Sequence, residues 1–263
     1  MFKRHKHFWN ILLLIVLLLV GTGAVRWKIQ LQANQRQIQN LKVNQTNIPT
    51  LFIPGYLGNK VTFGPMIDRF DKNHLGTDAM LIEVSKSGKI TAQHTASLHK
   101  NNPLIQVLFA TNKDQAVQAR HLMQVMTFRK NKYQVKQANL GGHSLGGNII
   151  FDYLGDATRS KTALPTTRKF VNLACDFPDD VNHGKYLQKN LEVLNIAGNM
   201  YNLGTDGVVS LKGALLLKQI VQGHVKSYQV HVLNGGMFDA YHSSLHENGQ
   251  VDRWILEFLF KQK

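Results

Sequence analysis

One serine, flanked by glycines, stands where a predicted strand gives way to a predicted helix. The segment Gly142-His143-Ser144-Leu145-Gly146 follows an apolar strand predicted over 135–140 and precedes an amphipathic helix predicted from about residue 147. In this setting a G-x-S-x-G sequence forms a tight turn that holds the serine hydroxyl toward solvent, and the helix N-terminus favours negative charge on a substrate. The alternative is an ordinary Gly/Ser-rich turn. We predict that Ser144 is a nucleophile.

From residue 48 the chain alternates strands with helices, as a mostly parallel sheet covered on both faces requires. Apolar runs predict strands, and apolar residues at helical spacing predict helices. The predicted strands cover residues 50–53, 80–84, 90–94, 105–109, 135–140, 170–174, 191–196 and 228–233. The predicted helices cover residues 114–128, 147–154, 213–221 and 251–260. This order predicts one domain over residues 48–263 with the α/β-hydrolase fold.

A serine hydroxyl is a poor nucleophile near neutral pH, so it needs a base and a carboxylate that orients the base. In this fold the acid follows a late strand. Asp206 fits, because it follows the 191–196 strand and its neighbours Gly204 and Gly207 permit a sharp turn that aims the carboxylate inward. The alternative for Asp206 is a surface turn. The reserve candidates are Asp176, Asp179 and Asp180, with Asp239 less favoured.

Two histidines compete for the role of base, since the base in this fold follows the last strand. His242 stands nine residues before Val251, where the closing helix is predicted to begin. His246 lies nearer that helix and could instead cap or orient it. We predict His242 as the base and keep His246 as the alternative. His143 is expected to pack beside the serine.

Backbone N–H groups are expected to stabilise the oxyanion of a tetrahedral intermediate. Leu145, directly after the nucleophile, should supply one donor, and Tyr56, in the loop after the first main strand, the second. The alternative for that loop is a plain glycine turn. No HExxH or clustered Cys/His pattern calls for a metal, so we expect neither metal nor cofactor. The single cysteine, Cys175, excludes an intramolecular disulfide and is predicted to be a core residue.

Taken together, these motifs are similar to those of a known family of proteins. The similarity is carried by Pro54-Gly55-Tyr56, residues 102–107, Gly142 to Gly146, Asp206-Gly207-Val208-Val209 and residues 242–248. The sequence resembles, over about residues 48–260, the poorly characterised α/β-hydrolases of Gram-positive bacteria such as lactobacilli that are labelled cell-surface hydrolases. The resemblance implies a serine hydrolase with an Asp-His pair, similar in plan to small bacterial lipases. Pro54 is a departure, because many relatives of the wider fold carry a histidine there.

The N-terminal residues 1–25 are predicted to enter a membrane. A basic cluster at residues 3–6 precedes Phe8–Val25, eighteen residues without a charge. At 1.5 Å per residue this stretch is about 27 Å long, just enough to cross a hydrocarbon core of about 30 Å. It is a retained anchor or a cleaved signal peptide, and we favour an anchor with the body outside the cell. Residues 26–47, rich in Gln and Asn, are predicted to form a polar stalk that holds the body away from the membrane.

The net charge of +15 is dispersed over the chain, with modest clusters at residues 129–132 and 185–189. No motif that reads nucleic acid accompanies these clusters, so we expect no nucleic-acid partner. For an extracellular body this charge favours residence near anionic lipid or anionic cell-wall polymer. The polar segment 176–189 is our candidate for a cover over the site.

The sequence therefore predicts a serine hydrolase, anchored at the cell surface, that cleaves small-molecule or lipid esters through an acyl-enzyme. An amidase or a thioesterase would use the same three side chains. From another class, a catalytically silent binding protein at the cell envelope would keep the fold without the activity. Reaction of Ser144 with a fluorophosphonate probe separates these readings.

Overall fold

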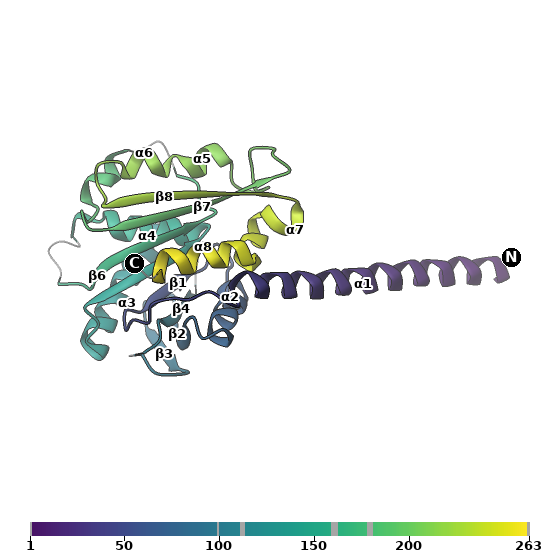
Figure 1. Cartoon of the computed structure of the whole chain (residues 1–263), viewed down its shortest axis with the longest axis horizontal. Helices are drawn as coiled ribbons and strands as arrows, with labels where there is room; N and C mark the ends of the chain where they lie inside the picture. Colours follow the sequence, from purple (N-terminus) through teal and green to yellow (C-terminus); the bar gives the residue numbers. More distant parts are fainter. Residues whose placement is uncertain (1, 99, 111–113, 159–162, 178–180, 262–263) are drawn as a thin grey trace.

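The computed structural model of the chain (Figure 1) describes residues 2–98, 100–110, 114–158, 163–177 and 181–261. Within these residues eight strands form one sheet in the order β3-β2-β4-β1-β5-β6-β7-β8. They are β1 (Thr50–Ile53), β2 (Thr77–Val84), β3 (Ile90–His94), β4 (Pro103–Phe109), β5 (Gln137–His143), β6 (Thr166–Leu173), β7 (Glu192–Met200) and β8 (Ser227–Gly235). The β2–β3 pair is antiparallel, and the other neighbouring strands are parallel.

Helices cover both faces of the sheet. They are α1 (Phe2–Ile38), α2 (Lys60–Lys72), α3 (Gln115–Tyr133), α4 (Leu145–Gly155), α5 (Leu211–Leu215), α6 (Leu217–Val221), α7 (Met237–Ala240) and α8 (Gly249–Phe260), with short 3₁₀ segments η2 (Val181–Tyr186) and η3 (His242–Glu247). Side chains of α3, α4 and α6 form one core with Leu51 and Ile53, whereas α2, α8 and the end of α1 form a second core with Phe52. Successive residues of β1 thus point to opposite faces.

The predicted fold, a mostly parallel sheet with helices on both faces, is confirmed, and each predicted strand overlaps an observed one. The helix predicted over 213–221 is two short helices, α5 and α6, that meet at Leu216. The helix α2 was not predicted from the sequence. Its buried side chains Phe63, Met66, Ile67 and Phe70 have helical spacing. Pro65 lies inside this helix and obscures the pattern.

The N-terminal helix α1 is continuous through the apolar segment and into the residues predicted as a stalk. Among the described residues it is the one helix long and apolar enough to cross a membrane, and its apolar window has no part buried inside the molecule. Figure 1 shows α1 projecting far from the body. Such a helix is consistent with a signal sequence or an anchor.

The last turns of α1 pack on the body. Ile38 is fully buried in the core that includes α8, and Asn34 is buried as well. The Asn34 amide donates to the Glu247 carbonyl, and its Oδ1 accepts from the Gly249 N–H at 2.9 Å. The helical end of the segment predicted as a stalk is thus packed on the body, where the Asn34 side chain bonds to η3 and α8.

Candidate active site

Ser144 occupies a strained turn between β5 and α4. Its φ of 54° and ψ of −133° lie outside the regions that residues with a side chain prefer, and it stands at the N-cap position of α4. The Ser144 N–H donates to the Leu173 carbonyl at 2.9 Å, which ties the turn to the end of β6. The Ser144 side chain is half-buried, so it remains reachable from solvent.

Glycines let the neighbouring backbone approach this turn closely. A Cβ on Gly146 would overlap the carbonyl oxygen of Ile53, at the end of β1. A Cβ on Gly55, in the loop after β1, would lie 2.7 Å from the Ser144 Cβ and 3.3 Å from the Leu145 N. Side chains at either position would force the loop and the turn apart. The loop that carries Tyr56 therefore lies directly beside Ser144.

Asp206 and His242 form a buried Asp-His pair at the same edge of the sheet. The Asp206 Oδ2 lies 2.8 Å from the His242 Nδ1, and the two residues are 1% and 7% exposed. The other carboxylate oxygen accepts the N–H groups of Val208 at 2.9 Å and Val209 at 2.6 Å. The His242 N–H donates to the Asp206 carbonyl at 2.9 Å. A carboxylate held this way favours a proton on Nδ1 and leaves Nε2 as the acceptor.

The serine turn and the histidine segment touch through His143. Its ring centroid lies 4.7 Å from that of His242, and its Nε2 lies 3.1 Å from the His242 carbonyl oxygen. Among the described residues no hydrogen bond joins the Ser144 hydroxyl to His242. Such bonds are often long before substrate binds. The structure thus brings Asp206 and His242 into direct contact and sets Ser144 one residue from a ring that touches His242.

Burial decides the charge of His143. Desolvation lowers the pKa of His143 well below its usual value, and the neighbouring His246 and His242 lower it further. The ring is therefore neutral at physiological pH. It packs beside the serine, as expected from the sequence, and with its lowered pKa it is a weak base that takes up no proton at that pH.

His246, the alternative base, lies in a different environment. Its ring meets the His143 ring edge-on at 4.9 Å between centroids, and its Nδ1 lies 3.4 Å from Glu247 Oε1. The carboxylate of Asp206 lies at hydrogen-bond distance, 2.8 Å, from the Nδ1 of His242 instead. The geometry therefore favours His242 for the role that needs an oriented imidazole.

Behind His246 lies an ionic cluster that was not predicted from the sequence, formed by Arg69, Glu247 and Asp252. The Arg69 guanidinium donates to Asp252 at 2.6 and 3.1 Å and to Glu247 at 3.1 Å, and it also reaches the His246 carbonyl at 3.1 Å. Burial raises the pKa of the Asp252 carboxyl to about 6, and the Arg69 charge opposes that rise. The cluster joins α2 and α8 to η3 and so fixes the segment that carries His242.

The reserve acids have other environments. Asp176 is exposed, and its carbonyl accepts from Asn148 at 2.8 Å. Asp239 lies in the first turn of α7, and Asp179 and Asp180 lie outside the described residues. In the segment 176–189, the candidate cover, η2 packs against α4 and α6.

Cys175 lies beneath the serine turn. It is buried, and its Sγ donates to the Ser144 carbonyl at 2.8 Å. Burial raises the pKa of its thiol, so the thiol stays protonated and unreactive. The predicted core position is confirmed.

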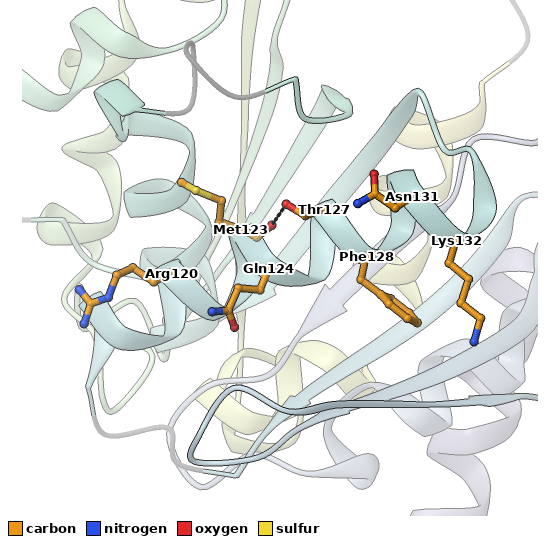
Figure 2. Close-up of a pocket in the computed structure, with 7 residues that line it drawn as sticks. All are labelled: Arg120, Met123, Gln124, Thr127, Phe128, Asn131 and Lys132. Atoms are coloured by element: carbon orange, nitrogen blue, oxygen red, sulfur yellow. Dashed lines mark hydrogen bonds between the residues drawn. The ribbon is translucent and has the colours of Figure 1, made fainter.

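Other features of the described residues lie away from Ser144. A shallow hollow of about 640 Å³ runs along the outer side of α3, and all of its lining residues come from that one helix (Figure 2). Figure 2 shows Thr127 turned back to the Met123 carbonyl, a bond of 2.9 Å within the helix. In the part of the chain that the structure describes, no group of three or more His, Cys, Asp or Glu residues could hold a metal ion.

A mostly parallel sheet, a strained serine between β5 and α4, and an Asp-His pair after β7 and β8 together define the class of α/β hydrolases. The chain belongs to the family described as "Alpha/beta hydrolase of unknown function (DUF915)", whose model matches residues 37–184 and 180–262. The match begins within the last turns of α1.

Solved structures support this assignment. The product of gene lin2722 from Listeria innocua is 26% identical, with a TM-score of 0.75 over 82% of this chain and 95% of that chain. A Lactobacillus plantarum WCFS1 protein, whose name assigns it provisionally to the cell surface hydrolases, is 20% identical, with a TM-score of 0.67 over 81% and 89%. The predicted resemblance to hydrolases of Gram-positive bacteria is confirmed. Comparison with curated proteins gives no significant match.

Proposed function

We propose that this protein is a serine hydrolase that cleaves carboxylic esters, with Ser144 as nucleophile, His242 as base and Asp206 as the acid that orients it. The observation that carries the proposal is the buried bond of 2.8 Å between Asp206 and His242, beside a serine held at positive φ. A buried carboxylate that contacts an imidazole fixes the tautomer of the imidazole. It also stabilises the imidazolium that forms when the imidazole takes a proton.

The reaction proceeds in two acyl transfers. The Ser144 oxygen attacks the ester carbonyl carbon while the His242 Nε2 takes the hydroxyl proton, and the carbonyl oxygen becomes an oxyanion. The carbon–oxygen bond to the alcohol then breaks, and His242 protonates the departing alcohol. Water repeats the attack on the acyl-enzyme with His242 again as base, so that ester and water give acid and alcohol.

The N–H groups of Leu145 and Tyr56 are the proposed donors to the oxyanion. Leu145 is the first residue of α4, where N–H groups lack partners within the helix. The close approach of Gly55 to Ser144 and to the Leu145 N supports a donor from the next residue, Tyr56. Preorganised N–H donors of this kind contribute about 10²–10³ in kcat.

The test is covalent labelling by a fluorophosphonate, followed by turnover of p-nitrophenyl butyrate. We expect wild-type protein to be labelled and Ser144→Ala to be neither labelled nor active, whereas Cys175→Ala, which changes the neighbouring buried side chain, keeps its labelling. Folded wild-type protein that takes no label would overturn the proposal and favour a silent binding protein. Parallel p-nitroanilide and thioester substrates separate an esterase from an amidase or a thioesterase.

We further propose that α1 is a retained anchor and that the body lies outside the cell. The basic residues at its start and the exposed apolar window support this orientation. The bonds of Asn34 to α8 support retention, because cleavage after the apolar segment would leave a short helix of Gln- and Asn-rich sequence to hold them. N-terminal sequencing of protein from membranes tests it, and a new terminus near residue 25 would show cleavage.

A further inference from the structure

Exposed apolar side chains gather at the edge of the sheet that carries Ser144. Outside α1, ten large apolar side chains are exposed among the described residues, and eight of them follow β1, β7 or β8. These eight form what we call the apolar rim: Tyr56, Leu57, Val61, Tyr201, Leu203, Val208, Met237 and Phe238. Parallel strands bring the segments after their carboxyl ends to one edge, where the Asp-His pair also lies. A concentrated apolar surface of this kind marks a contact.

The helix α1 leaves the body at this same edge. Figure 1 shows it running outward past α7, where β8 ends. Arg26 is the first charged residue after the apolar segment 8–25, and its guanidinium carbon lies 5.0 Å from the centre of the Phe238 ring. Asn34, eight residues and about 12 Å further along the helix, is bonded to Gly249. The contacts of Arg26 and Asn34 therefore hold α1 against the body. Phe238 lies beside the end of the apolar segment.

A groove of about 640 Å³ lies between α1 and the segment that carries His242. One wall is a single face of α1, formed by Gly23, Arg26, Gln30 and Asn34. The facing side chains belong to α7, η3 and neighbouring loops: Tyr201, Met237, Phe238, Asp239, Ser243, Ser244 and Glu247. The lining of the groove thus includes Gly23, inside the apolar segment, and Ser243, the residue after His242.

Building on the proposed function, we propose that the apolar rim faces the bilayer that holds α1, and that the site hydrolyses acyl esters of that bilayer's lipids, which enter along the groove. The walls combine the charges of Arg26, Asp239 and Glu247 with the apolar surfaces of Met237 and Phe238. This mixture suits the glycerol-ester region of a lipid, whose acyl chains stay in the membrane. The net charge of +15 adds attraction to an anionic lipid surface.

The orientation is tested by fluorescence quenching in vesicles of phosphatidylcholine and phosphatidylglycerol that carry the full chain. Cys175 is buried, so a nitrobenzoxadiazole label introduced at Leu203→Cys or Phe238→Cys reports one position. Lys136→Cys, an exposed position just before β5 at the opposite edge of the sheet, is the control. We expect spin-labelled lipid to quench positions 203 and 238 and to spare position 136. Equal quenching at all three, or none at 203 and 238, would overturn the orientation.

The substrate class is tested by the ratio of two activities in the same vesicles, release of fatty acid from the lipids and turnover of p-nitrophenyl butyrate. Gln30→Trp fills the groove, whereas Ile29→Trp adds the same bulk to the neighbouring exposed position. We expect Gln30→Trp to lower the lipid-to-butyrate ratio at least about tenfold and Ile29→Trp to keep it. Equal ratios in the two variants, or wild-type protein active on butyrate and inactive on lipid, would overturn the inference.

The two proposals fail in different ways. If the chain is not a serine hydrolase, fluorophosphonate labelling and butyrate turnover are both absent, whatever the quenching shows. If only the lipid inference is wrong, labelling and butyrate turnover persist without release of fatty acid.

Discussion

The segment η3 separates two buried polar regions, the Asp-His pair at one end and the ionic cluster at the other. In the ionic cluster every nitrogen of the Arg69 guanidinium is bonded to a carboxylate or a carbonyl. In the Asp-His pair, Asp206 is fully bonded, but the His242 Nε2 has no hydrogen-bond partner among the described residues. Both regions are buried and charged, yet only one keeps a basic atom available.

This difference indicates that the two regions have different roles, one structural and one chemical. A buried charge whose bonds are all made can hold elements together but cannot exchange a proton without breaking them. An imidazole held on one side and open on the other can take a proton and give it back. The ionic cluster therefore positions η3, and the Asp-His pair performs the chemistry that we propose.

The largest expected effect comes from removing the open imidazole. His242→Ala should lower kcat for p-nitrophenyl butyrate by about 10⁴-fold or more, because loss of one member of such a triad removes most of its joint effect. His246→Gln, on the next turn of η3, should stay within about tenfold of wild type, because its ring does not contact Asp206. Steady-state kinetics on both variants measures the contrast. The opposite pattern, with His246→Gln inactive and His242→Ala active, would move the base to His246.

The second effect concerns the closed region and is a loss of stability. Arg69→Met leaves Asp252 buried without its partner, which costs about 3–5 kcal/mol of unfolding free energy. Lys72→Met, on the same helix, breaks an exposed pair with Asp68 and should cost less than about 1 kcal/mol. Thermal unfolding of the full chain in detergent measures both. Equal losses would mean that the cluster contributes no more than a surface ion pair.

The sequence predicted much of the Asp-His pair and little of the ionic cluster, for a physical reason. Asp206 stands between glycines after a strand, and His242 follows the last strand, so chain order and local turn chemistry were enough to bring them together. Arg69 lies on a helix that was missed, and its carboxylate partners lie about 180 residues further along the chain. No local pattern distinguishes an arginine destined for burial from one on the surface.

The docking of α1 was hidden for a similar reason. A Gln- and Asn-rich segment reads as solvated spacer, because its side chains bury no apolar surface of their own. Asn34 is buried only because Gly249 permits the helix to approach; a Cβ there would lie 2.5 Å from the Asn34 Cα. This close contact joins residues far apart in sequence, and neither residue signals it alone.

The smallest expected effect is a pH dependence of the unfolding free energy. It comes from His143, whose ring lies between the two regions and contacts both His242 and His246. Its pKa is lowered in the folded state, so below about pH 6.5 the unfolded chain binds a proton that the native protein does not. Unfolding free energy therefore falls as the pH is lowered through this range, by up to about 1.4 kcal/mol per pH unit. His143→Gln lacks this titrating group. Its unfolding free energy should therefore fall less than that of wild type between pH 7 and pH 5.

The difference between the two curves isolates His143. The raised pKa of Asp252, about 6, acts in the opposite sense, because between its unfolded value and pH 6 the native protein binds the extra proton and is stabilised as the pH falls. That contribution is common to wild type and His143→Gln and cancels when one curve is subtracted from the other. Parallel curves from denaturant titrations at each pH would show that the His143 ring accepts a proton without cost, and that the space between the two regions is more polar than its burial implies.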